Sequence, residues 1–361
     1  MRWMGCAWLL IAGLRASAHA DPPPADSISH DRTVTVTASG SGSPWIDLAP
    51  PSSAVNVLEH HVTEPEQTAH PIAAATTLAG MYAVFAGWMY IAWYEHHHPL
   101  AQFKWGGDGW VGDQTYAGGA DKFGHAWSTM SLARLGTEML DQWGGYDRTK
   151  ANVVSTLASE LLFTGVEVKD GFYYEFSFSD LTGDTLGALA GFALSQWPRL
   201  DELFDYRVEY WPSTMYLRKL DGASPCPTGG CSKWNIAEDY SGQTYQLALH
   251  LGAIGSIREL PHGTIARFVD VAVGFGSRNY KPDAVTPADM AAAPGRPTQE
   301  LFLGVTLNAQ GLLDYLLENR TPKLREVTHG LFEVFSVPFT YPAVQYDHSP
   351  CPTCKVNVDG A

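Results

Sequence analysis

The sequence predicts an α+β protein, in which a helical bundle of about four main helices is followed by a small antiparallel β-sheet. Two patterns along the 361 residues support this prediction. Apolar segments bounded by glycine and proline occupy residues 71–210, as expected for packed helices. Beyond residue 240, apolar side chains alternate with other residues, which is typical of strands with one buried face.

The N-terminus has the features of a secretory signal peptide over residues 1–20. Arg2 precedes a mostly apolar stretch, and an Ala-His-Ala cleavage site ends at Ala20. We therefore expect an exported, periplasmic protein associated with a membrane of the cell envelope. Cys6 has almost no apolar core before it, so lipid attachment at this residue is not expected. Residues 21–70, rich in Pro, Ser, Thr and Asp, predict an extended or disordered lead segment.

The first predicted helix, over residues 72–93, contains no charged side chain. At about 1.5 Å per residue it is long enough to cross a hydrocarbon core of about 30 Å. Trp and Tyr side chains crowd its C-terminal end, as at a membrane interface. A membrane span is therefore the preferred interpretation. A fully buried central helix is the alternative, since no basic flank sets an orientation.

Three more helices are expected over about 121–143, 148–169 and 179–197. Glycine or proline follows each of them, which is the usual signal for a helix end. A short helical turn is expected at about 200–206. These elements complete a helical core domain that we assign to residues 71–210.

Three strands are expected over 245–251, 269–275 and 301–307, where apolar residues recur at every second position. Residues 329–341 fit either a helix or a strand. The remaining boundaries are a cysteine-containing connection at 211–240, a β-rich region at 241–346 and a cysteine-containing tail at 347–361.

Four cysteines form two short pairs, which are Cys226 with Cys231 and Cys351 with Cys354. In an oxidising compartment such pairs predict two disulfides, for which three connectivities are possible. A zinc site with four thiolates is the alternative.

Composition excludes one class of partner. The formal net charge is −15, and no basic stripe is present, so we expect no nucleic-acid partner. A membrane or another envelope component is the expected partner, and a protein partner is not predictable from the sequence.

Ionisable residues within otherwise apolar helical sequence are the main functional signal. Charges on buried helix faces are costly, so they are usually kept for ion pairing, metal binding or proton chemistry. The expected polar cluster contains Asp121, Lys122, His125, Glu160, Glu167, Asp170, Asp180 and Asp184.

Helical spacing predicts how these residues group. Asp121 and His125 are four residues apart and share a face, so the carboxylate could orient the imidazole. Glu160 and Glu167 also share a face. Gly183, Gly187 and Gly191 permit close contact with another helix, and they turn Asp180 and Asp184 toward that contact. The charges are therefore expected to converge between three helices.

Three roles remain open for the cluster. It can hold the bundle together, bind a ligand or headgroup, or form a catalytic or metal site. His125 as acid or base, with Asp121, is the catalytic candidate. No dedicated nucleophile motif, zinc-protease motif or P-loop accompanies it. We therefore assign no metal ligand and no cofactor, and whether the protein is an enzyme stays open.

Several stretches resemble a known family. They are Tyr-Ala-Gly-Gly-Ala-Asp-Lys-Phe-Gly-His ending at His125, Gly-Val-Glu-Val-Lys-Asp-Gly ending at Gly171, and Phe-Ser-Asp-Leu-Thr-Gly-Asp ending at Asp184. Glu-Asp-Tyr-Ser-Gly-Gln-Thr-Tyr, ending at Tyr245, and Val-Gly-Phe-Gly, ending at Gly276, also fit. With them the chain is similar to the YfiM-like predicted periplasmic lipoproteins, a domain of unknown function.

A looser resemblance connects the same order of motifs to VanZ-like membrane proteins. Those proteins typically have Asn where this chain has Asp184. The YfiM-like resemblance implies an envelope location and no established reaction. We therefore expect a structural or ligand-binding role for the cluster. The alternative is an enzyme acting on a lipid or cell-wall headgroup, with metal assistance as one form of it.

Overall fold

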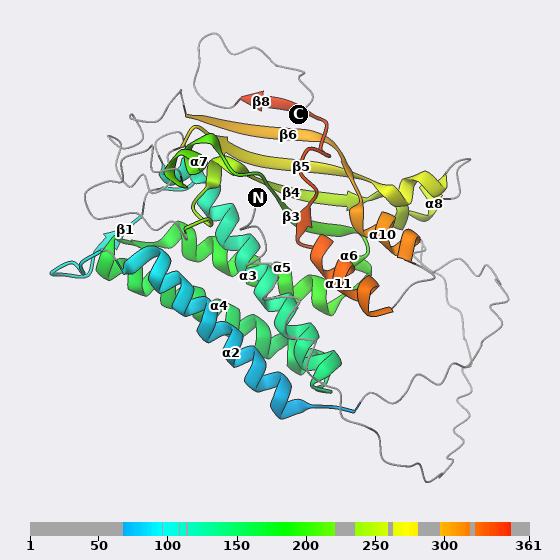
Figure 1. Ribbon diagram of the computed structural model, residues 1–361, viewed down its shortest axis with the longest axis horizontal. Helices are drawn as coiled ribbons and strands as arrows, with labels where there is room; N and C mark the ends of the chain where they lie inside the picture. Colours follow the sequence, from blue (N-terminus) through cyan, green and yellow to red (C-terminus); the bar gives the residue numbers. More distant parts are fainter. Residues whose placement is uncertain are drawn as a thin grey trace, which may run out of the picture. The chain divides into compact units, whose positions relative to one another are not determined.

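The computed structural model describes residues 68–95, 97–107, 109–112, 115–220, 235–258, 263–280, 297–317 and 322–347. They form several packed helices and a six-stranded, mostly antiparallel sheet (Figure 1), which confirms the α+β class. The predicted signal peptide, nearly all of the lead segment and the four paired cysteines lie outside the described residues.

The first described helix, α2 (Pro71–Met89), continues into a wider turn, η2 (Tyr90–Tyr94). By length and composition these 24 residues could cross a membrane. Only 17% of their most apolar stretch is buried. The helix is therefore not the fully buried central helix that the sequence left as an alternative.

Three long helices pack beside α2. They are α3 (Ala120–Glu138), which the short η3 (Tyr116–Gly119) precedes and η4 (Met139–Trp143) follows, α4 (Arg148–Tyr173) and α5 (Phe178–Gln196). Side-chain caps fix two of their starts. Asp147 accepts a hydrogen bond from the Lys150 amide, and Ser177 accepts one from the Asp180 amide. A two-residue parallel pair, β1 (Trp105–Gly106) with β2 (Phe176–Ser177), precedes α5.

Between these helices and the sheet lies α3, which contacts α4 and α5 on one side and β3, β4 and β5 on the other (Figure 1). Its sheet-facing side is aromatic. The Phe123 ring stacks on Phe275 with centroids 4.6 Å apart, and Trp127 Nε1 donates to the Val334 carbonyl at 2.8 Å. The polar residues of α3 can therefore face α4 and α5.

The sheet has the order β7-β3-β4-β5-β6-β8, with only the β3–β7 pair parallel. Its strands are β3 (Phe204–Tyr210), β4 (Gln243–His250), β5 (Val269–Arg278), β6 (Thr298–Leu307), β7 (Phe335–Ser336) and β8 (Ala343–Asp347). The register aligns Leu247, Val273, Leu303 and Val344 across four strands.

Short helices connect the strands. They are α6 (Pro198–Asp201), α7 (Thr214–Leu220), η5 (Tyr240–Gly242), η6 (Leu251–Ala253), α8 (Gly255–Arg258), η7 (Gly263–Phe268), α10 (Ala309–Leu317) and α11 (Pro322–Phe332). The stretch 329–341, which fitted either a helix or a strand, therefore contains the end of α11 and the short β7.

The sheet has three more strands than the sequence predicts, because β3 and β8 were missed and β7 lies in the stretch left open. Residues 200–206 were expected to form a helical turn, yet β3 begins at Phe204 and pairs with β4 along seven residues. In β3 the polar residues Asp205, Arg207 and Glu209 alternate with apolar ones, which is the period of a strand and was not recognised. Asp205 and Arg207 are buried in an ion-pair network.

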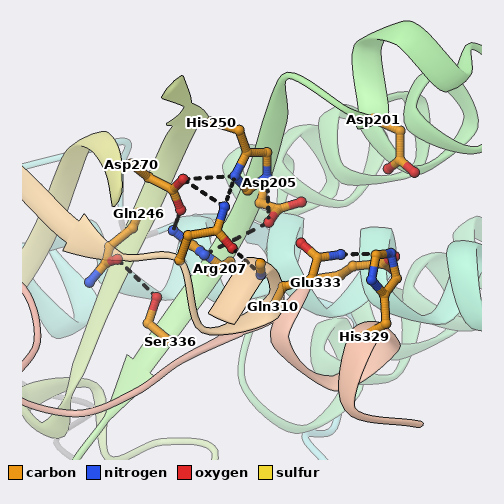
Figure 2. A network of polar contacts seen from close by, with 12 residues as sticks. Asp201, Asp205, Arg207, Gln246, His250, Asp270, Gln310, His329, Glu333 and Ser336 are labelled. Carbon is orange, nitrogen blue, oxygen red and sulfur yellow. Dashed lines mark hydrogen bonds and ion pairs between the residues drawn. The ribbon is translucent and has the colours of Figure 1, made fainter. Parts of the chain in front are cut away.

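Four buried ionisable side chains, Asp205, Arg207, His250 and Asp270, make up what we call the sheet network (Figure 2). His250 Nε2 lies 2.9 Å from Asp205 Oδ2, and His250 Nδ1 lies 2.8 Å from Asp270 Oδ1. Arg207 Nη2 lies 2.7 Å from Asp270 Oδ2. Two cationic groups thus balance two carboxylates across three adjacent strands.

The sheet network also holds the helices that follow the sheet. Asn308 Nδ2 donates to Asp270 Oδ1 at 2.9 Å, and Asn308 Oδ1 accepts a hydrogen bond from the Gly311 amide at the start of α10.

A second set of ion pairs starts from α3. Arg134 Nη2 lies 2.6 Å from Asp201 Oδ1 and 2.8 Å from Glu333 Oε2. Ion pairs therefore join α3 to α6 and to the end of α11.

The sheet network should make stability depend on pH in the alkaline range. Burial alone would lower the pKa of His250, but hydrogen bonds to Asp205 and Asp270 outweigh it and raise the pKa to about 9. Because the unfolded value is about 6.5, this stabilisation is complete below about pH 6.5 and is lost as the pH rises through about 9. His250→Gln should cost about 3 kcal/mol of unfolding free energy at pH 6, since it leaves two buried carboxylates with Arg207 as their one cation in the sheet network.

Urea unfolding at pH 6, 7.5 and 9.5 tests this expectation. The difference between wild type and His250→Gln should shrink as the pH rises, whereas the exposed His98→Gln should behave as wild type. A difference that stays constant over this range would contradict a charged His250.

Candidate functional site

The candidate site lies where α5 approaches α3. A Cβ on Gly183 would lie 2.7 Å from the Lys122 carbonyl oxygen, and one on Gly191 would lie 3.0 Å from the Met130 carbonyl oxygen. Real Cβ atoms rarely or never come so close, so glycine permits this approach. The same approach places Asp184 beside the polar side of α3.

Lys122 is held between two carboxylates at the start of the site. Its Nζ lies 2.7 Å from Asp121 Oδ2 and 3.0 Å from Asp180 Oδ1. Asp121 and Asp180 stand in the first turns of α3 and α5, where the helix dipole favours negative charge. These three residues, the Lys122 trio, join the starts of α3 and α5 through two buried ion pairs.

His125 faces α4 and α5 rather than the start of its own helix. Its Nδ1 lies 3.0 Å from Asp184 Oδ1 and 3.7 Å from Glu167 Oε1. Thr129, one turn further along α3, donates to the same Asp184 oxygen at 3.0 Å. Burial alone would lower the pKa of His125, but the nearby carboxylates, Asp184 first, raise it well above its usual value.

Glu167 is the most distinctive carboxyl group of the site. Its side chain is 1% exposed, and Oε2 accepts a hydrogen bond from the Ser177 amide at 3.2 Å. Within the part of the chain that the structure describes, Glu167 Oε1 and Asp184 Oδ2 are buried without a hydrogen-bond partner. Burial raises the pKa of Glu167 to about 9. Such unmatched buried oxygens are uncommon in proteins.

Two of the predicted residues lie at the edges of this arrangement. Asp170 Oδ1 accepts a hydrogen bond from the Tyr94 hydroxyl at 2.6 Å, and burial raises the pKa of Asp170 to about 7. Glu160 Oε1 accepts one from Thr185 at 2.7 Å, which ties α4 to α5. Burial also raises the pKa of Glu160.

The eight predicted residues therefore separate into three groups. One is the Lys122 trio, one is the pair of edge carboxylates, and one is the set His125, Glu167 and Asp184. In the last group one nitrogen and two carboxylate oxygens lie within 4.8 Å of one another, which makes these residues able to hold a metal ion. Helical spacing predicted that Asp121 would lie beside His125. Asp121 instead pairs with Lys122, and Asp184 is the carboxylate next to the imidazole.

Sequence reasoning missed several residues around the site. Thr129 is four residues after His125, so the same helical spacing could have found it. Tyr94 gave no such signal, because its partner Asp170 belongs to a helix far away in sequence. The sheet network was missed as well, although Asp205 and Asp270 stand as charged residues inside otherwise alternating strands.

Comparison with known proteins bears on this part of the chain. Residues 107–196 match a family described as "Predicted periplasmic lipoprotein (DUF2279)". The match includes α3, α4 and α5, and with them every residue of the predicted polar cluster. The strands of the sheet network lie beyond it. No curated protein and no solved structure matches the chain.

The family description agrees with the resemblance and with the periplasmic, membrane-associated location that the sequence predicts. Residues 107–196, which carry the site, are therefore similar to the predicted periplasmic lipoprotein family DUF2279.

Proposed function

We propose that this envelope protein binds a polar ligand in the helical cluster, at the group formed by His125, Glu167 and Asp184. The observation that carries the proposal is that two buried carboxylate oxygens beside one imidazole have no hydrogen-bond partner in the described residues. Leaving a buried polar atom unmatched costs about 1–3 kcal/mol. A bound ligand would remove that cost.

The number of carboxyl groups in the two buried networks supports a binding role over a purely structural one. In the sheet network, Arg207 and His250 balance Asp205 and Asp270. In the helical cluster, two cationic side chains face a larger set of acids. These acids are Asp121, Glu167, Asp170, Asp180 and Asp184. A cluster that served only to hold helices together would not need this excess of carboxyl groups.

Catalysis on a lipid or cell-wall headgroup is the second candidate. The observation in its favour is the hydrogen bond from His125 Nδ1 to Asp184 Oδ1, an oxygen that also accepts from Thr129. A carboxylate in this position orients an imidazole for acid–base work. The candidate acid or base is His125, and Asp184 takes the orienting role.

The outer sides of α4 and α5 support membrane contact by the same layer of helices. Exposed apolar residues on these helices are spaced by three, four, seven or eight positions, and they include Val154, Leu157, Leu161 and Val168 on α4 and Phe178, Leu186 and Leu189 on α5. Contiguous apolar surface of this kind marks interaction sites. A lipid surface is the occupant we propose, because the neighbouring α2 is apolar and mostly exposed and the matched family is described as lipoproteins.

Glu167→Gln should separate a binding role from a structural one. Glutamine keeps an acceptor for the Ser177 amide and removes a carboxyl group whose pKa is about 9. The folded protein therefore holds a proton that the unfolded chain releases above about pH 4.3, so wild-type stability falls as the pH rises toward 9. The variant should unfold within about 1 kcal/mol of wild type at pH 5 and become relatively more stable by pH 8.

Lys122→Met is the matched control within the same cluster. It removes the cation that pairs with Asp121 and Asp180, so it should destabilise the fold by about 3 kcal/mol. Both variants can be compared by chemical unfolding followed by circular dichroism. Loss of stability in Glu167→Gln as large as that in Lys122→Met would show that Glu167 is structural, and the binding proposal would be withdrawn.

Membrane contact predicts that charges on the outer helical side reduce lipid binding. Leu161 is 69% exposed and Leu186 is 59% exposed. The double change Leu161→Lys and Leu186→Lys should reduce binding of the full chain to phosphatidylcholine vesicles about tenfold, since buried charge is costly in lipid. Flotation on a density gradient measures this.

Leu303→Lys is the control, because Leu303 is 60% exposed but lies on the sheet. It should float as wild type does. Equal flotation of the double variant and wild type would contradict lipid contact through α4 and α5.

A further inference from the structure

The chemistry of the ligand can be narrowed from the three donor atoms themselves. His125, Glu167 and Asp184 come from three different helices, and each offers one donor to the same small volume. Asp184 and Glu167 are fully buried. The bundle thus presents a nitrogen and two carboxylate oxygens where water does not surround them.

The spacing of these atoms suits a single ion. Donors held about 2.0–2.2 Å from a tetrahedral metal lie about 3.3–3.6 Å from one another. The distances from His125 Nδ1 are 3.0 Å to Asp184 Oδ1 and 3.7 Å to Glu167 Oε1. These two distances bracket that range, and all three donor atoms lie within 4.8 Å of one another.

The unpartnered oxygens point to the same ligand class. Glu167 Oε1 and Asp184 Oδ2 are buried and lack a hydrogen-bond partner among the described residues. Both oxygens belong to groups that already hold the imidazole. A cation between these groups would give both unpartnered oxygens a positively charged partner.

We infer that His125, Glu167 and Asp184 bind one divalent transition-metal ion; this rests on the proposed binding role of the cluster. One imidazole with two carboxylates suits Zn²⁺ or Mn²⁺, whereas Ca²⁺ and Mg²⁺ prefer sites made of oxygen ligands. Three protein ligands leave a coordination position for water or for a ligand group.

Residues behind the three ligands already hold them in place. Thr129 donates to Asp184 Oδ1, and the Ser177 amide donates to Glu167 Oε2. Such outer hydrogen bonds fix the direction of metal ligands. Lys122 is engaged with Asp121 and Asp180, so its ammonium group is held by the neighbouring ion pair.

Metal titration of the full chain tests the inference. Purified protein is stripped with a chelator and titrated with Mn²⁺ and, in parallel, with Zn²⁺, using calorimetry and elemental analysis after dialysis. Mn²⁺ is included because the cysteines of the chain can also bind Zn²⁺. One ion of at least one metal should bind per chain at the cluster, and Asp184→Asn and Glu167→Gln should each weaken that binding about tenfold or more.

Glu160→Gln is the matched control, since Glu160 lies on the same face of α4 as Glu167 but is bonded to Thr185. It should bind metal as wild type does. The inference is overturned if neither ion binds, or if every ion that binds the wild type binds the Asp184 and Glu167 variants as tightly. If no metal binds but Glu167→Gln is as stable as wild type, only the metal site is contradicted. If that variant loses stability, the proposed binding role is contradicted as well.

Discussion

The close approach of α5 to α3 determines where the charges of the helical layer lie. Glycines at the contact let backbone meet backbone, and side chains larger than hydrogen at Gly183 or Gly191 would push the helices apart. At this separation Asp184 reaches His125 and Asp180 reaches Lys122. A wider gap would leave both cations without their α5 partner, so the polar cluster depends on a feature that carries no charge.

The position of α3 between two layers explains why its polar and aromatic residues are divided so sharply. Phe123 and Trp127 pack toward the sheet, while His125 and Thr129 face α4 and α5. The sheet and the helices therefore cover different sides of α3. The sheet covers its aromatic side, and the helices supply carboxylates for its polar side. Arg134 extends this role toward α6 and the end of α11.

The sequence was sufficient for the fold class and for the three long helices of the cluster, because apolar periodicity and glycine or proline at the ends are local signals. It also placed the acids of α3, α4 and α5 in one region. It could not choose their partners. Helical spacing favoured Asp121 for His125, but the contact between helices brought Asp184 there. Strand β3 was missed although apolar and polar residues alternate along it. What the sequence could not show is that Asp205 and Arg207 are buried, because that depends on their partners His250 and Asp270.

The exposure of the cluster residues indicates from which end a ligand would enter. Glu167 and Asp184 are sealed, whereas the side chains of His125 and Asp180 keep 16% and 14% of their surface exposed. On α4 the inward residues Phe163 and Glu167 are buried, and outward Leu157 and Leu161 are apolar. Entry through the side of the bundle would therefore have to cross a layer of aliphatic groups. A polar ligand would more readily enter from the end where α3 and α5 begin, past Asp180 and His125.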